Sequence, residues 1–165
     1  MRTVTLTRGK TALVDDEDYE LVSGIPWSAT NNGRGDRWYA VHRSQRFGNL
    51  RMHRLILNAP DHLQIDHVDG NTLDNRRSNL RLATRSQNGA NRRLSKNNTS
   101  GFTGVTWNKN WQKWEAQIKV RGERLALGGF ASPEEAAAVY NRVALAHFGE
   151  FARLSNEGGD DGPPT

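Results

Sequence analysis

Alternating apolar and polar positions run through the first fifty residues and predict a β-rich region. Residues 2–14 alternate around Arg8-Gly9-Lys10, which is typical of a β-hairpin. A short helix is expected over 15–22, where acidic residues occupy the first turn. Further strands are expected over 25–29 and 38–42, with a Gly/Asn-rich loop at 31–36 between them. We interpret residues 1–50 as a support for the segment that follows.

The next segment predicts two strands joined by turns. Residues 50–57 are mainly apolar and indicate a strand. Apolar residues flank Asp66-His67, and Asp69-Gly70-Asn71 supplies turn chemistry. We therefore expect Asp66 and His67 on a hairpin. Because they are adjacent in an extended chain, their side chains should point to opposite faces.

A helix is predicted to follow this hairpin. Thr84 and Gln87 have the spacing of a capping box, so the helix should begin there and run to about Arg93. This places Asn79 in the connector before the helix and Asn88 on the helix itself. Residues 94–100 are polar and lack periodicity, which is typical of a linker.

The last third of the chain predicts three strands and one helix. Strands are expected over 101–107, around 114–120, where apolar side chains share one face, and over 124–127. Ser132 and Pro133, with Glu135 three residues after the serine, are a strong helix start, and Gly149 can end that helix. Its small alanines would let it lie close against the apolar face of the sheet.

Composition agrees with several small modules rather than one large core. The 165 residues are 35% hydrophobic and 25% charged, with a mean hydropathy of −0.79. The expected fold class is α+β. The expected divisions are a β-rich support over 1–50, a finger over 51–93, a linker over 94–100, a sheet-and-helix module over 101–155 and a disordered tail over 156–165.

Positive charge is concentrated and favours a nucleic-acid partner. The net charge is +5 and the pI about 10.0, and residues 76–96 hold seven Arg or Lys with no Asp or Glu. The absence of cysteine excludes disulfides and cysteine zinc sites. No signal region or membrane-spanning run is present in the sequence, so we expect a soluble, intracellular (cytoplasmic) protein without membrane association. For residues 1–50 the alternative is a secondary DNA contact through Arg34, Arg37, Arg43 and Arg46.

The residue types around position 67 suit phosphodiester hydrolysis. His67 can accept a proton near neutral pH. Asp66 is a hard oxygen ligand for Mg²⁺ or Mn²⁺, and Asn88 adds a neutral oxygen. Asp-Gly alone would indicate only a turn, and Asn88 alone would be a solvent-facing helix residue. An EF-hand calcium loop is excluded, because Gly70 is fifth from Asp66 rather than sixth and Arg77 stands at the twelfth position.

The spaced set Asp66-His67, Asn79 and Asn88 resembles the HNH nuclease motif in its homing-endonuclease form, as found in phage and prophage genomes. The resemblance implies a β-β-α-metal finger. It also implies His67 as general base, Asp66 and Asn88 as ligands of one Mg²⁺ or Mn²⁺ ion, and Asn79 as the residue that fixes the loop around the histidine. Products would carry 5′-phosphate and 3′-hydroxyl ends. His53 either contributes to this site or is a packed or phosphate-touching histidine.

Arginines around this motif have two interpretations. A charge run usually forms a solvated face, but beside a phosphodiester site we expect phosphate contacts. Those predicted DNA contacts are Arg76, Arg77, Arg81, Arg85, Arg92 and Arg93.

The segments Trp114–Ile118, Leu127–Phe130 and Glu134–Ala137, among other positions, form a second recognisable pattern. Through them, residues 101–155 resemble the ethylene-response-factor (APETALA-two-type) DNA-binding domain. It implies a three-stranded sheet that enters the major groove. Several arginines of that family are replaced here, so its sequence preference is not carried over. The predicted DNA contacts in this module are Thr106, Asn108, Lys119 and Arg124.

Together these patterns predict a metal-dependent DNA endonuclease that binds double-stranded DNA as a monomer or weak dimer. No obligate protein partner is evident. The rival hypothesis is a DNA-binding transcriptional regulator whose finger has no catalytic role.

Overall fold

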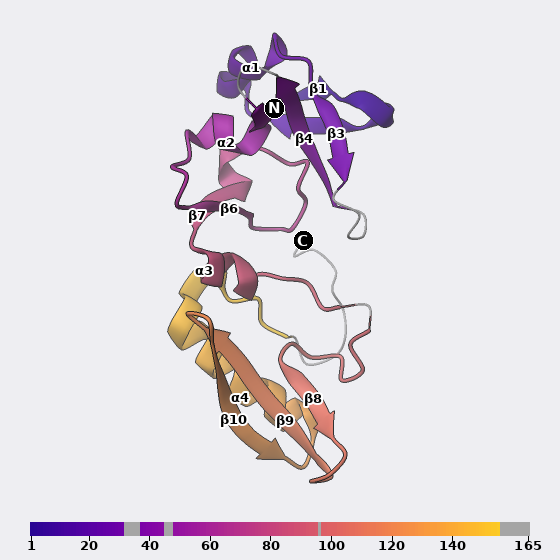
Figure 1. The fold of residues 1–165 in the computed structure, drawn as a ribbon, viewed down its shortest axis with the longest axis vertical. Helices are drawn as coiled ribbons and strands as arrows, with labels where there is room; N and C mark the ends of the chain where they lie inside the picture. The colour runs from indigo at the N-terminus through magenta and orange to yellow at the C-terminus, as the bar shows by residue number, and fades with distance from the viewer. Residues whose placement is uncertain (32–36, 45–47, 96, 156–165) are drawn as a thin grey trace. The chain divides into compact units, whose positions relative to one another are not determined.

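The computed structural model describes residues 1–31, 37–44, 48–95 and 97–155. It divides into two compact units, Met1–Thr84 and Arg85–Thr165, which are described separately (Figure 1). Three features of the sequence analysis lie outside the described residues: Arg34, Arg46 and the expected tail over 156–165. No helix in the described ranges is long and apolar enough to cross a bilayer.

The first unit contains three small antiparallel sheets and short helices. The predicted hairpin and first helix are present, and the strand expected at 25–29 begins three residues later. The elements are β1 (Arg2–Thr5), η1 (Thr7–Gly9), β2 (Thr11–Val14), α1 (Asp16–Ser23), β3 (Ser28–Asn31), β4 (Trp38–Ser44), β5 (Gly48–Arg51), α2 (Met52–Leu57), β6 (Gln64–His67), η2 (Arg77–Asn79) and β7 (Leu80–Ala83). Strands pair as β1-β2, β3-β4-β5 and β6-β7.

The strand expected over 50–57 is wrong. β5 ends at Arg51, and the apolar run that follows is the helix α2. A short apolar run fits a strand or a helix equally well. Here Met52 and Ile56, four residues apart, both face the core, and Asn58 ends the helix in the left-handed conformation (φ 44°).

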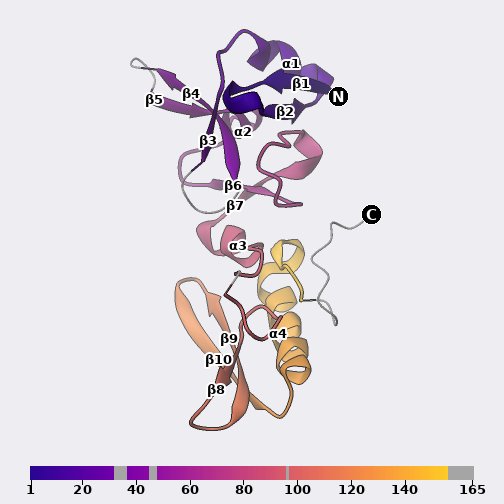
Figure 2. The same ribbon diagram turned by 90° about the vertical axis from the view of Figure 1, so that its right-hand side faces the viewer.

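One core joins the support to the finger. Val14, Val22 and Met52 are fully buried, and Ile65 and Leu80 of the β6–β7 hairpin belong to the same apolar cluster. The hairpin that carries Asp66 and His67 is therefore packed on the sheets that precede it in the chain (Figure 2).

The second unit is a three-stranded sheet with one long helix, as predicted, although its first strand begins at Val105 rather than at residue 101. Its elements are α3 (Arg85–Ala90), β8 (Val105–Asn108), β9 (Lys113–Val120), β10 (Glu123–Phe130), α4 (Pro133–Phe148) and η3 (Gly149–Phe151), and the sheet order is β10-β9-β8. The Ser132 hydroxyl accepts a hydrogen bond from the Glu135 N–H at the start of α4. α3 ends at Ala90, three residues before the predicted end, after Gly89 weakens the helix.

Close packing holds α4 on the sheet. Ile118 of β9 lies in one cluster with Tyr140, Ala144 and Phe148 of α4. Gly104 has a positive φ of 70°, and a Cβ atom there would stand 2.3 Å from the Tyr140 ring, so only glycine fits. The mixture of antiparallel sheets and helices in both units confirms the α+β class.

Candidate active site

His67 ends strand β6 in a buried aromatic cluster. Its side chain is about 4% exposed, and the ring centroids of His53 and Tyr39 lie 5.2 Å and 6.4 Å away. The β6–β7 register sets His67 opposite Leu80 and Asp66 opposite Arg81. The hairpin predicted for Asp66 and His67 is thus present.

The electrostatics of His67 favour a neutral imidazole. Burial lowers its pKa below the ordinary value of 6.5. The neighbouring Asn75 side chain and the carboxylates of Asp69, Asp66 and Asp74 act in the opposite direction, but burial prevails. A neutral ring at neutral pH is the form that can accept a proton from water.

Asp66 forms a buried ion pair with Arg81. The carboxylate is about 4% exposed, and its Oδ2 accepts from Arg81 Nε at 2.8 Å and lies 2.7 Å from Arg81 Nη2. Arg81 was predicted as a phosphate contact, and the structure places its guanidinium on this carboxylate. A carboxylate held in this way has a fixed orientation.

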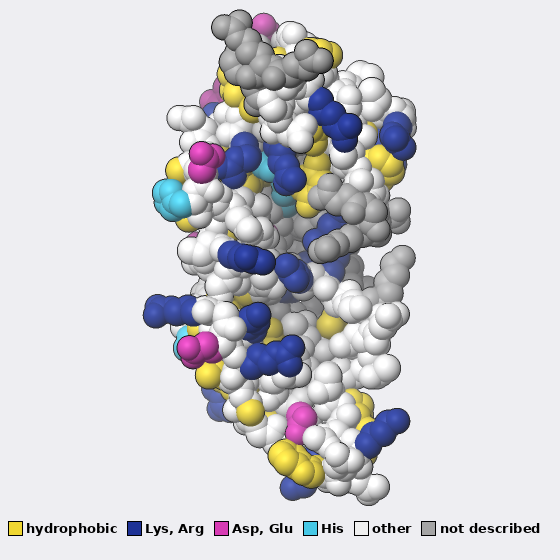
Figure 3. Space-filling model, in the orientation of Figure 1, with side chains coloured by type: hydrophobic (Ala, Val, Ile, Leu, Met, Phe, Trp, Pro, Cys, Tyr) yellow, Lys and Arg dark blue, Asp and Glu magenta, His cyan; other side chains and the backbone are white. Residues whose placement is uncertain are grey.

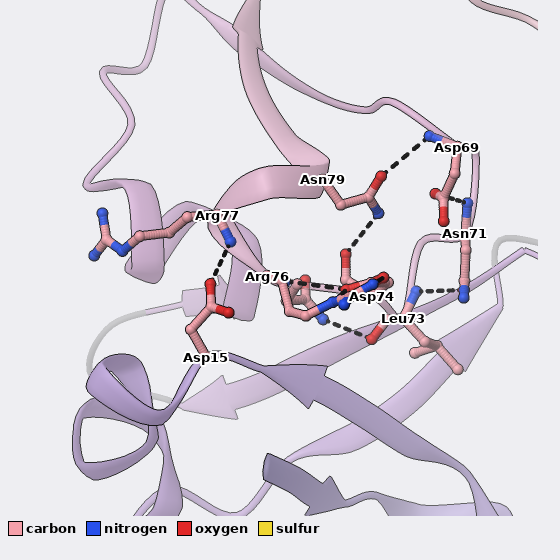
Figure 4. A network of polar contacts seen from close by, with 9 residues as sticks. Asp15, Asp69, Asn71, Leu73, Asp74, Arg76, Arg77 and Asn79 are labelled. Atoms are coloured by element: carbon pink, nitrogen blue, oxygen red, sulfur yellow. Dashed lines mark hydrogen bonds and ion pairs between the residues drawn. The ribbon is translucent and has the colours of Figure 1, made fainter. Parts of the chain in front are cut away.

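Asn79 holds the turn that follows β6 (Figure 4). Its Oδ1 accepts from the Asp69 N–H at 3.1 Å, and its Nδ2 donates to the Asp74 carbonyl at 3.0 Å. Gly70, with φ 76°, donates its N–H to the His67 carbonyl and closes the predicted turn. The loop contacts expected of Asn79 are present, and its part in catalysis stays a prediction.

Arg76 and Arg77 are bonded to carboxylates of the fold, and their side chains are 36% and 47% exposed. Arg76 Nε donates to Asp74 at 2.8 Å, and although burial alone would raise the pKa of Asp74, the Arg76 interactions lower it. Arg77 binds Asp18, which is about 3% exposed, through two hydrogen bonds of 2.7 and 2.8 Å, and its N–H donates to Asp15 (Figure 4). The sequence indicates acidic residues in the first turn of this helix, but its pattern does not connect them with these arginines.

His53 is the residue whose environment the sequence did not reveal. It lies in α2, about 5% exposed, and burial, followed by electrostatic interaction with His67, Arg51 and Arg54, lowers its pKa to about 3. The neutral His53 ring packs edge-on against His67. The ring is packed, as one of the two interpretations held, and a contribution of His53 to the site stays a prediction.

The remaining finger residues lie in the second unit. Asn88 is half-buried in α3 and Arg85 begins that helix, whereas Arg92 and Arg93 follow its end and are exposed. They therefore do not close the helix as expected. Asp66 and Asn88 belong to different units, so their shared metal stays a prediction.

The sheet of the second unit presents a polar face. Thr106, Lys119 and Arg124 are exposed, and Arg124 pairs in register with Lys119. Asn108 differs, because its Nδ2 donates to Glu115 and its Oδ1 accepts from the Asn110 and Trp111 N–H groups. Asn108 thus stabilises the β8–β9 turn.

The oxygen donors suit a hard divalent cation. No group of three or more His, Asp or Glu side chains that could hold a metal occurs within the described ranges. Mg²⁺ commonly uses one or two protein carboxylates and completes its shell with water and substrate phosphate oxygens. The fixed, buried Asp66 carboxylate is a hard oxygen donor and fits that pattern better than a zinc site.

Comparison with known proteins finds similarity to HNH endonucleases. The profile of the HNH endonuclease family matches residues 58–90. An uncharacterized HNH endonuclease of Acanthamoeba polyphaga mimivirus is 32% identical over 88% of this chain and 74% of its own length. Protein 3.8 of Escherichia phage T7 is 35% identical over 58% of this chain and 78% of its own length.

The C-terminal part is similar to plant proteins. Dehydration-responsive element-binding protein 2A of Arabidopsis thaliana is 43% identical over 36% of this chain, which corresponds to 18% of the plant protein. No solved structure matches this chain.

Proposed function

This chain belongs to the HNH endonuclease family, and from that premise we propose that it hydrolyses a phosphodiester bond of DNA with the help of one Mg²⁺ or Mn²⁺ ion. The observation that carries the proposal is the adjacent, buried pair at the end of β6: the imidazole of His67, whose pKa is lowered, beside the fixed carboxylate of Asp66.

His67 is the proposed general base. Because its pKa lies below 6.5, the ring is neutral at physiological pH and can take a proton from an attacking water. The protonated ring would be stabilised by the carboxylates of Asp69, Asp66 and Asp74, which favour the charged form. Tyr39 and His53 pack against the ring and restrict its orientation.

Asp66 and Asn88 are the proposed metal ligands. When bound, the ion would supply positive charge to the phosphate and leaving oxygen. Arg81 orients the Asp66 carboxylate through Oδ2. Asn79 fixes the turn after His67, and we propose that hydrolysis leaves 5′-phosphate and 3′-hydroxyl ends.

DNA binding is proposed for both units. Arg85, which begins α3, and the exposed Arg92 and Arg93 are the candidates in the finger. In the second unit, Thr106, Lys119 and Arg124 on the polar face of the sheet are the candidates, supported by the similarity to the plant element-binding proteins.

A supercoiled plasmid tests the proposal. Purified full-length protein should convert it to relaxed circles with Mg²⁺ or Mn²⁺ and not with chelator. One chain has one site, so nicking should precede any linear product. DNA ligase should reseal the nicks, since it requires 5′-phosphate and 3′-hydroxyl ends. Retained plasmid binding without nicking in either metal would instead support the regulator.

A further inference from the structure

An open pocket of about 360 Å³ lies along strand β3 in the first unit. Its walls are Thr7 and Arg8 of η1, residues 28–31 of β3, and Trp38 and Arg43 of β4. None of these residues belongs to the β6–β7 hairpin. Lys and Arg side chains are visible over the β3–β4 region on the face shown in Figure 3.

A hydrogen bond and strand pairing hold the walls of the pocket in position. The Ala29 N–H of β3 donates to the Thr7 hydroxyl at 3.0 Å, which docks the β1–β2 turn against the strand. Trp38 pairs in register with Asn31 across β3 and β4 and packs against the main core of the unit. The walls are thus fixed by the fold.

The backbone at Arg8 is strained. Arg8 and Gly9 both adopt positive φ values, 63° and 64°, at the centre of the tight turn between β1 and β2. Gly, Asn and Asp are the residues that favour this conformation, and a long side chain there is unfavourable. Arginine at this position gives the hairpin no conformational advantage, which points to a use for its charge.

The cations in and next to the pocket differ from the arginines of the finger. The Arg8 guanidinium and the Lys10 ammonium both lie near the Trp38 ring, 5.6 and 5.5 Å from its centroid. Among the described residues, no carboxylate forms an ion pair with Arg8, Lys10 or Arg43. Within the described ranges their charge is not neutralised by an ion pair, whereas Arg76, Arg77 and Arg81 are each paired with an aspartate.

We infer that this pocket binds backbone phosphates of the DNA duplex. Arg8 and Arg43 would contact phosphate oxygens, Lys10 would add positive charge, and the Trp38 ring would pack against the sugar. The first unit would then hold DNA with cations that lie outside the finger. The inference rests on the DNA partner of the proposed function but does not depend on cleavage.

The test uses fluorescence anisotropy of a labelled duplex with the full-length protein in chelator, where cleavage does not occur. Arg8→Asn should weaken binding about 3- to 10-fold and reduce the slope of log affinity against log salt by about 0.9, the effect of one lost phosphate contact. Its melting temperature should stay the same or rise, because asparagine suits the turn. Arg43→Gln is the second variant and should weaken binding in the same way.

Arg2→Gln is the matched control. It removes the same charge from the first unit, but Arg2 lies outside the pocket, near Glu20 and over the Tyr19 ring. Its affinity and salt slope should equal those of the wild type. Wild-type affinity and slope in both Arg8→Asn and Arg43→Gln would overturn the inference.

Two further outcomes separate the alternatives. If deoxyadenosine monophosphate binds in an Arg8-dependent way while duplex affinity does not depend on Arg8, the pocket takes free nucleotides and the inference is wrong. If duplex affinity depends on Arg8 but no plasmid is nicked, the DNA contact stands and the nuclease proposal fails.

Discussion

Asp66 and Arg81 face each other across the β6–β7 hairpin, and the guanidinium holds the buried carboxylate at 2.7–2.8 Å. Both side chains are largely shielded from solvent, at 5% and 15% exposure. The proposed metal ligand is therefore already oriented by a cation from the neighbouring strand, and we propose that Arg81 acts on the site through Asp66.

This pairing predicts a large coupling in stability. Arg81→Gln leaves a buried carboxylate without its cation and should lower the free energy of unfolding by about 3–5 kcal/mol. The double variant with Asp66→Asn should lose clearly less than the sum of the two single variants. Urea unfolding measures all three, with exposed Lys119→Gln as the control. Additive losses would mean that the ion pair does not hold the hairpin.

We predict that Arg77 contributes mainly to the stability of the fold. It ties η2 to Asp18 of α1, which is almost fully buried, and also donates to the Ile56 carbonyl. Arg77→Gln should therefore lower the free energy of unfolding by about 2–4 kcal/mol. Exposed Arg92→Gln removes the same charge and should change stability by less than about 0.5 kcal/mol. Equal stabilities of the two variants would contradict this assignment.

His53 predicts a pH dependence of stability. Its pKa is about 3 in the folded protein, lowered chiefly by burial, against 6.5 in the unfolded chain. Between pH 6.5 and 3 the unfolded chain binds a proton at His53 that the folded protein does not bind. The contribution of His53 to the free energy of unfolding is therefore complete above pH 6.5 and declines as the pH falls toward 3. The slope from this group is at most about 1.4 kcal/mol per pH unit.

The measurement is urea unfolding between pH 7 and 4.5, where most carboxylates stay charged. His53→Gln cannot gain the proton and should show a smaller loss across this interval than the wild type. The comparison of slopes is independent of the absolute stability of the variant. Identical slopes would show that His53 is not buried as a neutral ring.

Asn79 gives a test of the turn after His67. Asn79→Asp keeps the oxygen that accepts from Asp69, but it loses the N–H that donates to the Asp74 carbonyl and places a charge at a buried position. It should lower the free energy of unfolding by about 2–3 kcal/mol. Asn71→Asp is the matched control, because Asn71 is exposed and uses its Oδ1 only to accept from Leu73. Similar losses in both variants would contradict the bridging role.

Local patterns predicted much of the fold. The Ser132-Pro133 start of α4, the alternation in β9 and the turn at Gly70 are each set by neighbouring residues, and each is present. The prediction of a strand over residues 52–57 was wrong, because the length and apolarity of this run do not distinguish a strand from a helix. Packing of Met52 and Ile56 against the core favours the helix.

The partners of the arginines could not be predicted in the same way. Arg77 and Asp18 are 59 positions apart, and Arg81 meets Asp66 only through the strand register. Sequence patterns identify a charged residue but not whether its partner is a carboxylate of the fold or a phosphate. His53 is similar, because its burial depends on the α2 packing that the sequence left ambiguous.

The most direct test of the central claim is the rate of plasmid nicking by His67→Ala under single-turnover conditions with Mg²⁺ and with Mn²⁺. Loss of the general base should reduce the rate at least about 100-fold. His62→Ala removes an exposed histidine from the same unit and should nick at the wild-type rate. Nicking by His67→Ala at the wild-type rate would contradict the account.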